Sequence, residues 1–391
     1  MNVIIVGGGI IGVSIAYHLA EAGVKDVILM EMDYLGAGST KTVSPWIMKL
    51  TNTSENLALS EIGVNEYKSF KQKFNVNLGY RQCGVLSIGP STMKNYLDET
   101  LKLLQSRDVK VDSVSQNEIG KLAPFLNVSD IERGVFCHED GPLDAHKVLN
   151  TYASFALMNG VEIKVGSRVK HIIVEQNKVK GVLLESGEII YAGIVINAAG
   201  LRAIEIGNSI GINLPIQNSL RHEIYTNDTV LFPEYSPLIE ILAPEEIYID
   251  YAPGEIGRHG RIGIGRDISK DYLQVANIPK TVDLYGDGLS FRVPDVGKLS
   301  FTKASAGIRC LTPDNFPIIG NVSGIDGYIN CCGWGGFGMT HAPAAGKIIT
   351  ALITGDKPPV DITPFSYSRF ESHISITEEE KSRLDINTRN E

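Results

Sequence analysis

The sequence predicts an α/β fold in which a parallel sheet is interrupted by a second domain with a mostly antiparallel sheet. The first observation is a strand–helix–strand pattern at the N-terminus, and the second is a series of short apolar strands and helical segments up to residue 213. The third is a change of pattern from Leu214 to Phe301, where strand-like runs alternate with Pro/Gly turns. At 391 residues the chain is long enough for two domains.

The first 31 residues have the pattern of a βαβ unit. Asn2–Val6 is typical of a short buried strand, and Val27–Met30 of a second one. The helix between them is marked by apolar residues on one face and by a glycine that ends it: Ile11, Ile15, Leu19, Ala22 and Gly23. The turn after the first strand has glycines at the GxGxxG positions, Gly7, Gly9 and Gly12. This combination predicts a Rossmann-like dinucleotide-binding domain.

Each residue of this motif has a physical task. Gly7 permits the tight turn, Gly9 lets the backbone approach a pyrophosphate, and Gly12 allows the helix to pack closely on the strand. The helix N-terminus attracts the phosphate charge. Glu31, at the end of the second strand, is placed to bind the ribose hydroxyls.

Two further segments bear on which dinucleotide binds. A small, polar, glycine-rich loop follows Glu31 and contains Gly38, Ser39 and Thr40, which suits a second pass of backbone along the pyrophosphate and flavin of FAD. The apolar strand that begins at Ile194 ends in Ala198-Ala199-Gly200, where small residues allow a ligand to approach. The alternative for this second segment is a tight strand-to-helix turn without a ligand.

The rest of the chain indicates how the domains are divided. We expect helices at 56–74, 93–106 and 143–159, and strands at 84–89, 161–165, 169–174, 179–185, 188–191, 238–242, 247–251 and 261–265. Glycine-rich turns and a long helix are expected over 307–353. These patterns predict a discontinuous FAD-binding domain that comprises residues 1–80, 145–213 and 305–370. A substrate-binding domain comprises residues 81–144 and 214–304, and residues 371–391 form a tail.

The composition argues against several classes of protein. The formal net charge is −9 and no dense run of Lys and Arg occurs, so no nucleic-acid partner is expected. The five cysteines lack CxxC or zinc-ligand spacing, which predicts no metal site and a reduced, cytoplasmic chain. No segment reaches the roughly 18 apolar residues of a transmembrane helix. The apolar run Val3–Val6 is too short for a signal peptide.

Four segments together resemble the D-amino-acid oxidase-like FAD-dependent oxidoreductases. They are residues 6–12 with Glu31, residues 195–200, residues 307–320, and Gly333-Trp334-Gly335-Gly336-Phe337-Gly338-Met339-Thr340 ahead of a helix. Glycine oxidase and the β-subunits of sarcosine oxidase and of dye-linked proline dehydrogenase are most similar in pattern. The resemblance covers nearly the whole chain, to about residue 370.

The resemblance implies an extended FAD whose flavin ring lies between the two domains. Residues 335–340 would line the flavin pyrimidine edge, with the positive end of the following helix directed at it. Val169 would hold the adenine through its backbone. Motif and resemblance together give the expected cofactor-binding residues: Gly7, Gly9, Ile10, Ile11, Gly12, Glu31, Met32, Gly38, Ser39, Thr40, Val169, Ala198, Ala199, Gly200, Gly307, Arg309, Gly335, Gly336, Phe337, Gly338, Met339 and Thr340.

The expected catalytic residues are Arg309, Tyr248, Tyr251 and Lys49. The resemblance implies that Arg309 binds the substrate carboxylate, which suits the planar fork of a guanidinium. Tyr248 and Tyr251 would offer a hydroxyl to the same carboxylate, with core packing as the alternative for each. Lys49, together with Trp46, is a candidate for one flavin face. His222 is a weaker candidate, and a surface position is the stronger interpretation for it.

The implied activity is oxidation of a small amine or amino acid of glycine, sarcosine, proline or D-amino-acid type, by hydride transfer to flavin N5 that yields an imine. Gly307 stands where relatives with covalent flavin have a cysteine, so non-covalent FAD is expected. No lysine occurs near Gly263, where an oxygen-activating lysine would align, which favours a dehydrogenase over an oxidase.

Several alternatives stay open. One is an FAD-dependent 2-hydroxy-acid or glycerol-phosphate dehydrogenase, and another is an FAD-holding subunit of a multi-chain dehydrogenase. The electron acceptor is a quinone, a partner subunit or oxygen. A homo- or hetero-oligomer is compatible with the sequence.

Overall fold

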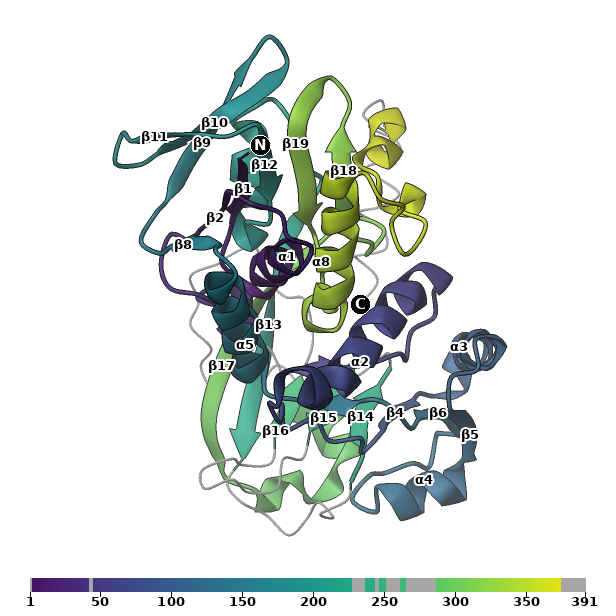
Figure 1. Cartoon of the computed structure of the whole chain (residues 1–391). Coiled ribbons are helices and arrows are strands. Elements are labelled where there is room, and N and C mark those ends of the chain that lie inside the picture. Colours follow the sequence, from purple (N-terminus) through teal and green to yellow (C-terminus); the bar gives the residue numbers. More distant parts are fainter. Residues whose placement is uncertain are drawn as a thin grey trace.

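The computed structural model describes residues 2–41, 45–226, 236–242, 246–250, 261–264 and 286–373. Two sheets dominate these residues, and they lie at opposite ends of the molecule in Figure 1. Of the expected tail, residues 374–391 lie outside the described residues, as do the candidate Tyr251 and the side chain of His222.

The first sheet contains the N-terminal βαβ unit. Its strand order is β11-β10-β19-β12-β1-β2-β8, with β18 paired to β19 and β9 paired to β10. The strands are β1 (Val3–Val6), β2 (Val27–Met30), β8 (Glu162–Lys164), β9 (Val169–Glu175), β10 (Lys178–Leu184), β11 (Ile189–Tyr191), β12 (Ile194–Asn197), β18 (Ile318–Val322) and β19 (Ile325–Cys332). The central pairs from β8 to β19 are parallel, as the sequence predicts.

Apolar residues cover both faces of this sheet, which explains the uninterrupted apolar run of β1. Val3 and Ile5 belong to one core and Ile4 and Val6 to the other, because successive strand residues point to opposite faces. The first core is shared with three helices that lie together in front of the sheet in Figure 1: α1 (Ile10–Glu21), α5 (Ala145–Met158) and α8 (Gly338–Thr354). α6 (Ala203–Asn208) contributes to the second core.

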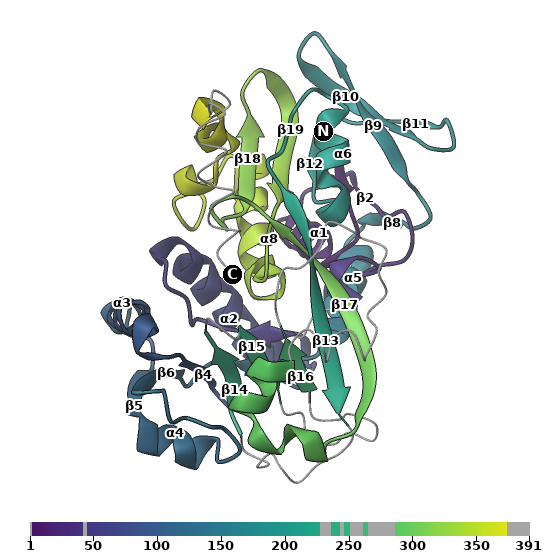
Figure 2. The same cartoon turned by 180° about the vertical axis from the view of Figure 1, so that it is seen from behind.

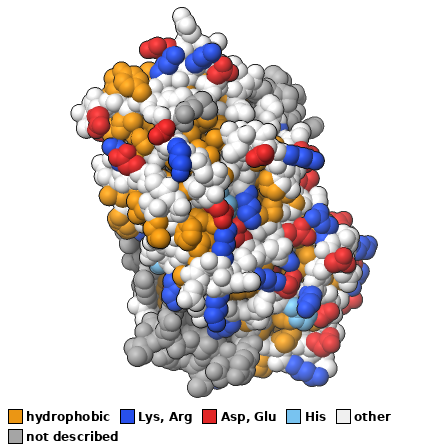
Figure 3. Space-filling view, viewed as in Figure 1, with side chains coloured by type: hydrophobic (Ala, Val, Ile, Leu, Met, Phe, Trp, Pro, Cys, Tyr) orange, Lys and Arg blue, Asp and Glu red, His pale blue; other side chains and the backbone are white. Residues whose placement is uncertain are grey.

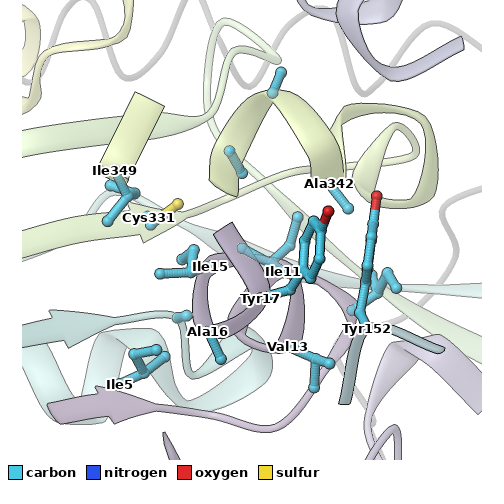
Figure 4. Close-up of a cluster of buried hydrophobic side chains, with 14 of the residues drawn as sticks. Ile5, Ile11, Val13, Ile15, Ala16, Tyr17, Tyr152, Cys331, Ala342 and Ile349 are labelled. Atoms are coloured by element: carbon cyan, nitrogen blue, oxygen red, sulfur yellow. The ribbon is translucent and has the colours of Figure 1, made fainter. Parts of the chain in front are cut away.

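Aromatic stacking joins α1 to α5 inside the first core. The rings of Tyr17 and Tyr152 are 4.6 Å apart between centroids and nearly parallel, and Figure 4 shows them side by side. Val13 and Ile15 also point into this cluster of buried side chains (Figure 4). Aromatic contacts of this kind add to the stabilisation from burial, so the packing fixes α1 against its neighbours.

The second sheet is antiparallel except for the pair β14 and β4. Its order is β17-β13-β16-β15-β14-β4-β6-β5. The strands are β4 (Val85–Ile88), β5 (Val111–Ser115), β6 (Arg133–Cys137), β13 (Gln217–Thr226), β14 (Leu238–Ile241), β15 (Ile247–Asp250), β16 (Arg261–Ile264) and β17 (Phe301–Leu311). Further elements are the helices α2 (Ser54–Phe74), α3 (Lys94–Ser106) and α4 (Gln116–Leu122), and the short pair β3 (Trp46–Ile47) and β7 (Gly141–Pro142).

β13 and β17 are two long strands that lie side by side between the two ends of the molecule (Figure 2). Residues 307–311 belong to β17, so the expectation of a glycine-rich turn there was wrong. The reason is that β13 pairs with this segment residue by residue, from Gln217 with Leu311 onward. Arg309 therefore lies in a strand, near the end of β17, which is the terminal strand of the second sheet.

The surface of the described residues mixes both signs of charge, and on the face shown in Figure 3 apolar side chains lie among them. Met158 at the end of α5 and Tyr191 in β11 are 79% and 70% exposed. No helix in the described part of the chain is long and apolar enough to cross a membrane.

The buried carboxylate of Glu66 links four helices, α1, α2, α5 and α8. Glu66 of α2 accepts hydrogen bonds from the Tyr152 hydroxyl and from Lys347 Nζ at 2.7 Å, and its Oε2 lies 3.3 Å from His18 Nε2. Burial alone would raise the pKa of Glu66, but the hydrogen bond and charge of His18, together with Lys347, lower it to about 2. Glu66 therefore stabilises the fold in its ionised form.

Replacing Glu66 with Gln should lower the free energy of unfolding at pH 7 by roughly 3 kcal/mol. This is the lower limit for breaking a buried ion pair, and it applies because Lys347 is partly exposed. Since its folded pKa lies below the ordinary value of 4.5, this stabilisation is complete above about pH 5 and is lost as pH falls toward 2. Urea unfolding at pH 7 and pH 3 measures it. The matched control is Glu61→Gln. Glu61 lies on the same helix as Glu66 and pairs with Arg107 at the surface, so its replacement should cost less than about 1 kcal/mol. Equal losses for both variants would contradict the assignment.

Candidate active site

A single cavity of about 770 Å³ extends from the carboxyl ends of β1, β2 and β12 to the second sheet. Most residues expected to hold FAD line it: Gly7, Gly9, Ile10, Ile11, Glu31, Met32, Gly38, Ser39, Thr40, Val169, Ala198, Ala199, Gly200, Gly307, Arg309, Gly335, Gly336, Phe337, Gly338 and Met339. Gly12 and Thr340 are not among the described lining residues. The cavity thus joins segments that are far apart in sequence.

The glycine turn after β1 is packed too closely for side chains. A Cβ on Gly12 would lie 1.9 Å from the Gly7 carbonyl oxygen, so Gly12 serves the packing of α1 on β1. Gly7 has φ +111°, and a Cβ there would lie 2.4 Å from the Ala198 carbonyl oxygen. The turn therefore lies directly against the end of β12, and the two segments form one wall of the cavity.

Glu31 is held in place by backbone amides. Gly8 N–H donates to its Oε2 at 2.7 Å and Asp33 N–H donates to its Oε1 at 2.8 Å. The side chain is 9% exposed and lines the cavity. Each carboxylate oxygen keeps a lone pair for a further donor, which suits the two hydroxyls of a ribose.

The loop after β2 is tied to both ends of the cavity. Thr40 Oγ1 accepts a hydrogen bond from Ile10 N–H at 3.1 Å, at the start of α1. Ser39 Oγ donates to the Ile308 carbonyl of β17 at 2.7 Å. These bonds hold the loop over the cavity, so both residues act first as supports of its wall.

The second helix N-terminus at the cavity belongs to α8. Residues 335–339 line the cavity just before and at the start of this helix. The Arg309 guanidinium lies on the backbone of Gly336, where a Cβ would be 3.1 Å from its Cζ. Thr340 Oγ1 instead contacts the Trp46 carbonyl and Met48 N–H, both at 3.3 Å. It joins α8 to the segment that follows β3.

Lys49 does not line the cavity with the other described residues. Its Nζ donates to Glu139 Oε2 at 2.7 Å, and its backbone N–H donates to Asp140 Oδ1 at 2.7 Å. The neighbouring Met48 and Leu50 line the cavity instead, because side chains alternate along extended backbone. The structure therefore places Lys49 behind the cavity wall.

Tyr248 of β15 lines the cavity and has charged neighbours. Its hydroxyl donates to Glu240 Oε1 at 3.1 Å, and its ring is 5.6 Å from that of Trp46. Burial, and then the negative charge of Glu240, raises the pKa of Tyr248 to about 12, although Arg221 and Arg309 oppose the shift. Tyr248 is therefore neutral at physiological pH.

The second sheet places a transverse row of residues at this end of the cavity. Glu223 pairs with Gly263, Gly263 with Tyr248, Tyr248 with Glu240, and Glu240 with Ser87. Residues paired across strands share a face. Sequence reasoning missed the lining residues Arg221, Glu223, Glu240, Tyr96 and Met48. The alternation in Arg221-His222-Glu223 was an available signal, since it puts the two charged residues on one face.

The residues present fit FAD. Gly38 and Gly200 line the cavity, and a Cβ built on either would meet nothing within 4 Å, so their backbone is open to a ligand. The amides of the first turn of α1 have no acceptors within the helix. Asn56 is 6% exposed and lines the cavity, and its Oδ1 has no hydrogen-bond partner in the described residues. A dinucleotide satisfies these groups.

This fold is that of a nucleotide-binding oxidoreductase, with two sheets and a cavity that reaches both of them. The chain belongs to the FAD dependent oxidoreductase family, whose model matches residues 2–352. FAD is therefore its cofactor, and the predicted fold class and family are confirmed.

Individual relatives are more distant. The chain is 27% identical over 383 residues to the mitochondrial pyruvate dehydrogenase phosphatase regulatory subunit of Mus musculus, covering 94% of this chain and 43% of that protein. It is 26% identical to the sarcosine oxidase subunit beta of Rhizobium meliloti, covering 96% and 90%. The crystal structure of L-proline dehydrogenase from P. horikoshii superposes with a TM-score of 0.86 at 24% identity, covering 95% and 98%. The chain spans less than half the length of several curated relatives.

Replacing Glu31 with Gln should weaken FAD binding by about 1.5–3 kcal/mol, or roughly 10- to 150-fold in Kd, the range for a hydrogen bond to a charged group. An amide has only one acceptor oxygen, so Gly8 N–H or Asp33 N–H loses its partner. Quenching of flavin fluorescence measures Kd. Glu21→Gln, at the far end of α1, is the control and should leave Kd unchanged. Equal affinity of the wild type and Glu31→Gln would remove Glu31 from the binding site.

Proposed function

We propose that this chain oxidises a small amine or amino acid that carries a free carboxylate. The observation that carries the proposal is the position of Arg309. It lines the cavity from near the C-terminal end of β17 and lies on Gly336, beside the N-terminus of α8. A guanidinium is the side chain best matched to a carboxylate. The sarcosine oxidase subunit and the proline dehydrogenase, similar to this chain over most of their length, are named for substrates of this class.

Each part of the cavity has a proposed task. Glu31, the first turn of α1 and Val169 hold the adenosine and pyrophosphate, and the N-terminus of α8 directs its positive end at the flavin. When bound, FAD supplies the hydride acceptor that converts the substrate amine to an imine. Arg309 orients the substrate by its carboxylate. We assign residues 1–80, 145–213 and 305–370 to FAD binding and residues 81–144 and 214–304 to the substrate.

We assign Tyr248 a role other than the expected one of donating its hydroxyl to the substrate carboxylate. Its hydrogen is directed at Glu240, so the oxygen offers lone pairs to the cavity. Such an oxygen accepts a hydrogen bond from a substrate N–H and does not donate to a carboxylate. We therefore assign Tyr248 to holding the amine, with Glu240 fixing the direction of its hydroxyl.

The flavin is held non-covalently in this proposal. Gly307 has no thiol, and burial raises the pKa of the nearby Cys310 to about 12, which disfavours the reactive thiolate. The preference for a dehydrogenase over an oxidase, the electron acceptor, the oligomeric state and a cytoplasmic location stay predictions.

The test is a visible spectrum of the purified protein followed by anaerobic additions. Glycine, sarcosine, proline and D-amino acids are each paired with the corresponding 2-hydroxy acid where one exists. Bleaching of the flavin by at least one amine supports the proposal. Bleaching by hydroxy acids alone would overturn it in favour of a hydroxy-acid dehydrogenase.

A second candidate is an FAD-holding subunit that needs partner chains. It is favoured by the 27% identity to a protein named as a regulatory subunit. Turnover of an artificial dye by the isolated chain counts against this candidate. FAD binding without reduction by any of the amines supports it.

A further inference from the structure

A second arginine faces the same cavity as Arg309. Ser219 of β13 pairs with Arg309 of β17, and Arg221 pairs with Gly307, so the two arginines are diagonal neighbours on one face of adjacent strands. Both line the cavity. Gly307, which is opposite Arg221, also lines the cavity and adds no side chain there.

The Arg221 guanidinium is held by an aromatic face. Its Cζ lies 4.0 Å from the ring centroid of Tyr248 in β15. β16 lies between β13 and β15, and its residue in the transverse row is Gly263. Stacking of this kind fixes the plane of the guanidinium. Its N–H groups lie in that plane, so they point away from the ring and are free of it to bind an acceptor.

One of these groups has no acceptor within the part of the chain that the structure describes: Arg221 Nη2 is buried and makes no hydrogen bond there. The neighbouring carboxylates are engaged by hydroxyls: Glu240 by Ser87 at 2.8 Å and by Tyr248, and Glu223 by Tyr225 at 2.7 Å. A buried N–H donor without an acceptor is costly, so a bound ligand is the natural source of an acceptor for Nη2.

We propose that Arg221 binds a second carboxylate, so that the substrate is an amine carrying two carboxylates, one on Arg309 and the other on Arg221. This inference rests on the proposed function for the amine and for the role of Arg309. It adds the substrate class, because a single carboxylate placed on Arg309 leaves Arg221 Nη2 without an acceptor.

Sarcosine and iminodiacetate form a matched pair for the test, since they differ only in an N-methyl against an N-carboxymethyl group. The measured quantity is the ratio of kcat/KM for iminodiacetate to that for sarcosine. The wild type should favour iminodiacetate, and Arg221→Met, which keeps an apolar contact with the Tyr248 ring, should lower the ratio by about 30-fold or more. Arg221→Gln provides a second variant if Arg221→Met does not fold. Arg107→Gln, which removes a surface charge, should leave the ratio unchanged.

Two results would overturn the proposal. One is a wild type that does not prefer iminodiacetate. The other is an equal fall for both substrates in the Arg221 variants, which would mean that both arginines share one carboxylate.

A binding experiment separates this proposal from the proposed function. Glutarate and butyrate replace the nitrogen by carbon, so they cannot be oxidised as amines. Calorimetry on the FAD-loaded protein should show tighter binding of glutarate than of butyrate, and Arg221→Met should abolish the difference. If no amine bleaches the flavin and this difference is present, the second carboxylate site stands and the proposed oxidation fails. If amines are oxidised and the difference is absent, the second carboxylate site fails alone.

Discussion

Arg309→Ala should lower kcat/KM for a carboxylate-bearing amine by roughly 30- to 5000-fold, the 2–5 kcal/mol typical of truncating one partner of a buried charged pair. The reason lies in its surroundings. Arg309 lies near the end of β17, where it is paired with Ser219 of β13, and rests on Gly336 at the end of the cavity where α8 begins. Arg309→Lys keeps the charge and loses the planar fork, so it should fall between the wild type and Arg309→Ala.

Anaerobic stopped-flow reduction of the flavin measures this effect, since it separates substrate binding from the reductive step. The flavin content and Tm of each variant show whether the cavity is intact. Arg107→Gln is again the charge control, because its side chain pairs with Glu61 on the surface. Unchanged binding and reduction in Arg309→Ala would show that the substrate carboxylate binds elsewhere.

The nucleotide end of the site could be predicted from sequence because its determinants are local. The turn from Gly7 to Gly12 and the carboxylate of Glu31 lie within one βαβ unit, whose geometry follows from strand and helix periods. The apolar run of β1 was also informative, since a strand covered on both faces has no polar alternation. Local pattern and tertiary structure agree here.

The end of the cavity at the second sheet could not be predicted in the same way, because strand pairing assembles it. Arg221, Tyr248 and Glu240 come from β13, β15 and β14, and their positions relative to one another depend on the register of three strand pairs. A shift of one residue in any pair would turn these side chains to the other face. A single sequence does not specify that register.

Lys49 illustrates the same limit on a smaller scale. Its charge made it a candidate for the flavin face, but in the structure Met48 and Leu50 line the cavity and Lys49 pairs with Glu139. The partner is 90 residues away in sequence. The extended segment around Lys49 can be predicted from local sequence. Only the tertiary structure shows which of its two faces is turned to the cavity.

Gly12→Ala should weaken FAD binding by about 1–3 kcal/mol, which is the usual cost of overpacking. This corresponds to a rise in Kd of roughly 5- to 150-fold. A Cβ at this position would lie 1.9 Å from the Gly7 carbonyl oxygen, and that neighbour is backbone, so it cannot rotate away. α1 must therefore move off β1, which carries its first-turn amides away from the pyrophosphate. Since Gly7 is itself packed against Ala198, the displacement also affects the end of β12.

Gly120→Ala in α4 is the matched control. A Cβ there meets nothing within 4 Å, and alanine is favoured over glycine inside a helix by about 0.5–1 kcal/mol, so this variant should be at least as stable as the wild type. Flavin fluorescence gives Kd and thermal unfolding of the apoprotein gives Tm for both variants. A Gly12→Ala protein that binds FAD as the wild type does would show that the α1 amides do not hold the pyrophosphate. A lower Tm with normal Kd would confine Gly12 to packing, because the close contact would then stabilise the fold without positioning the cofactor.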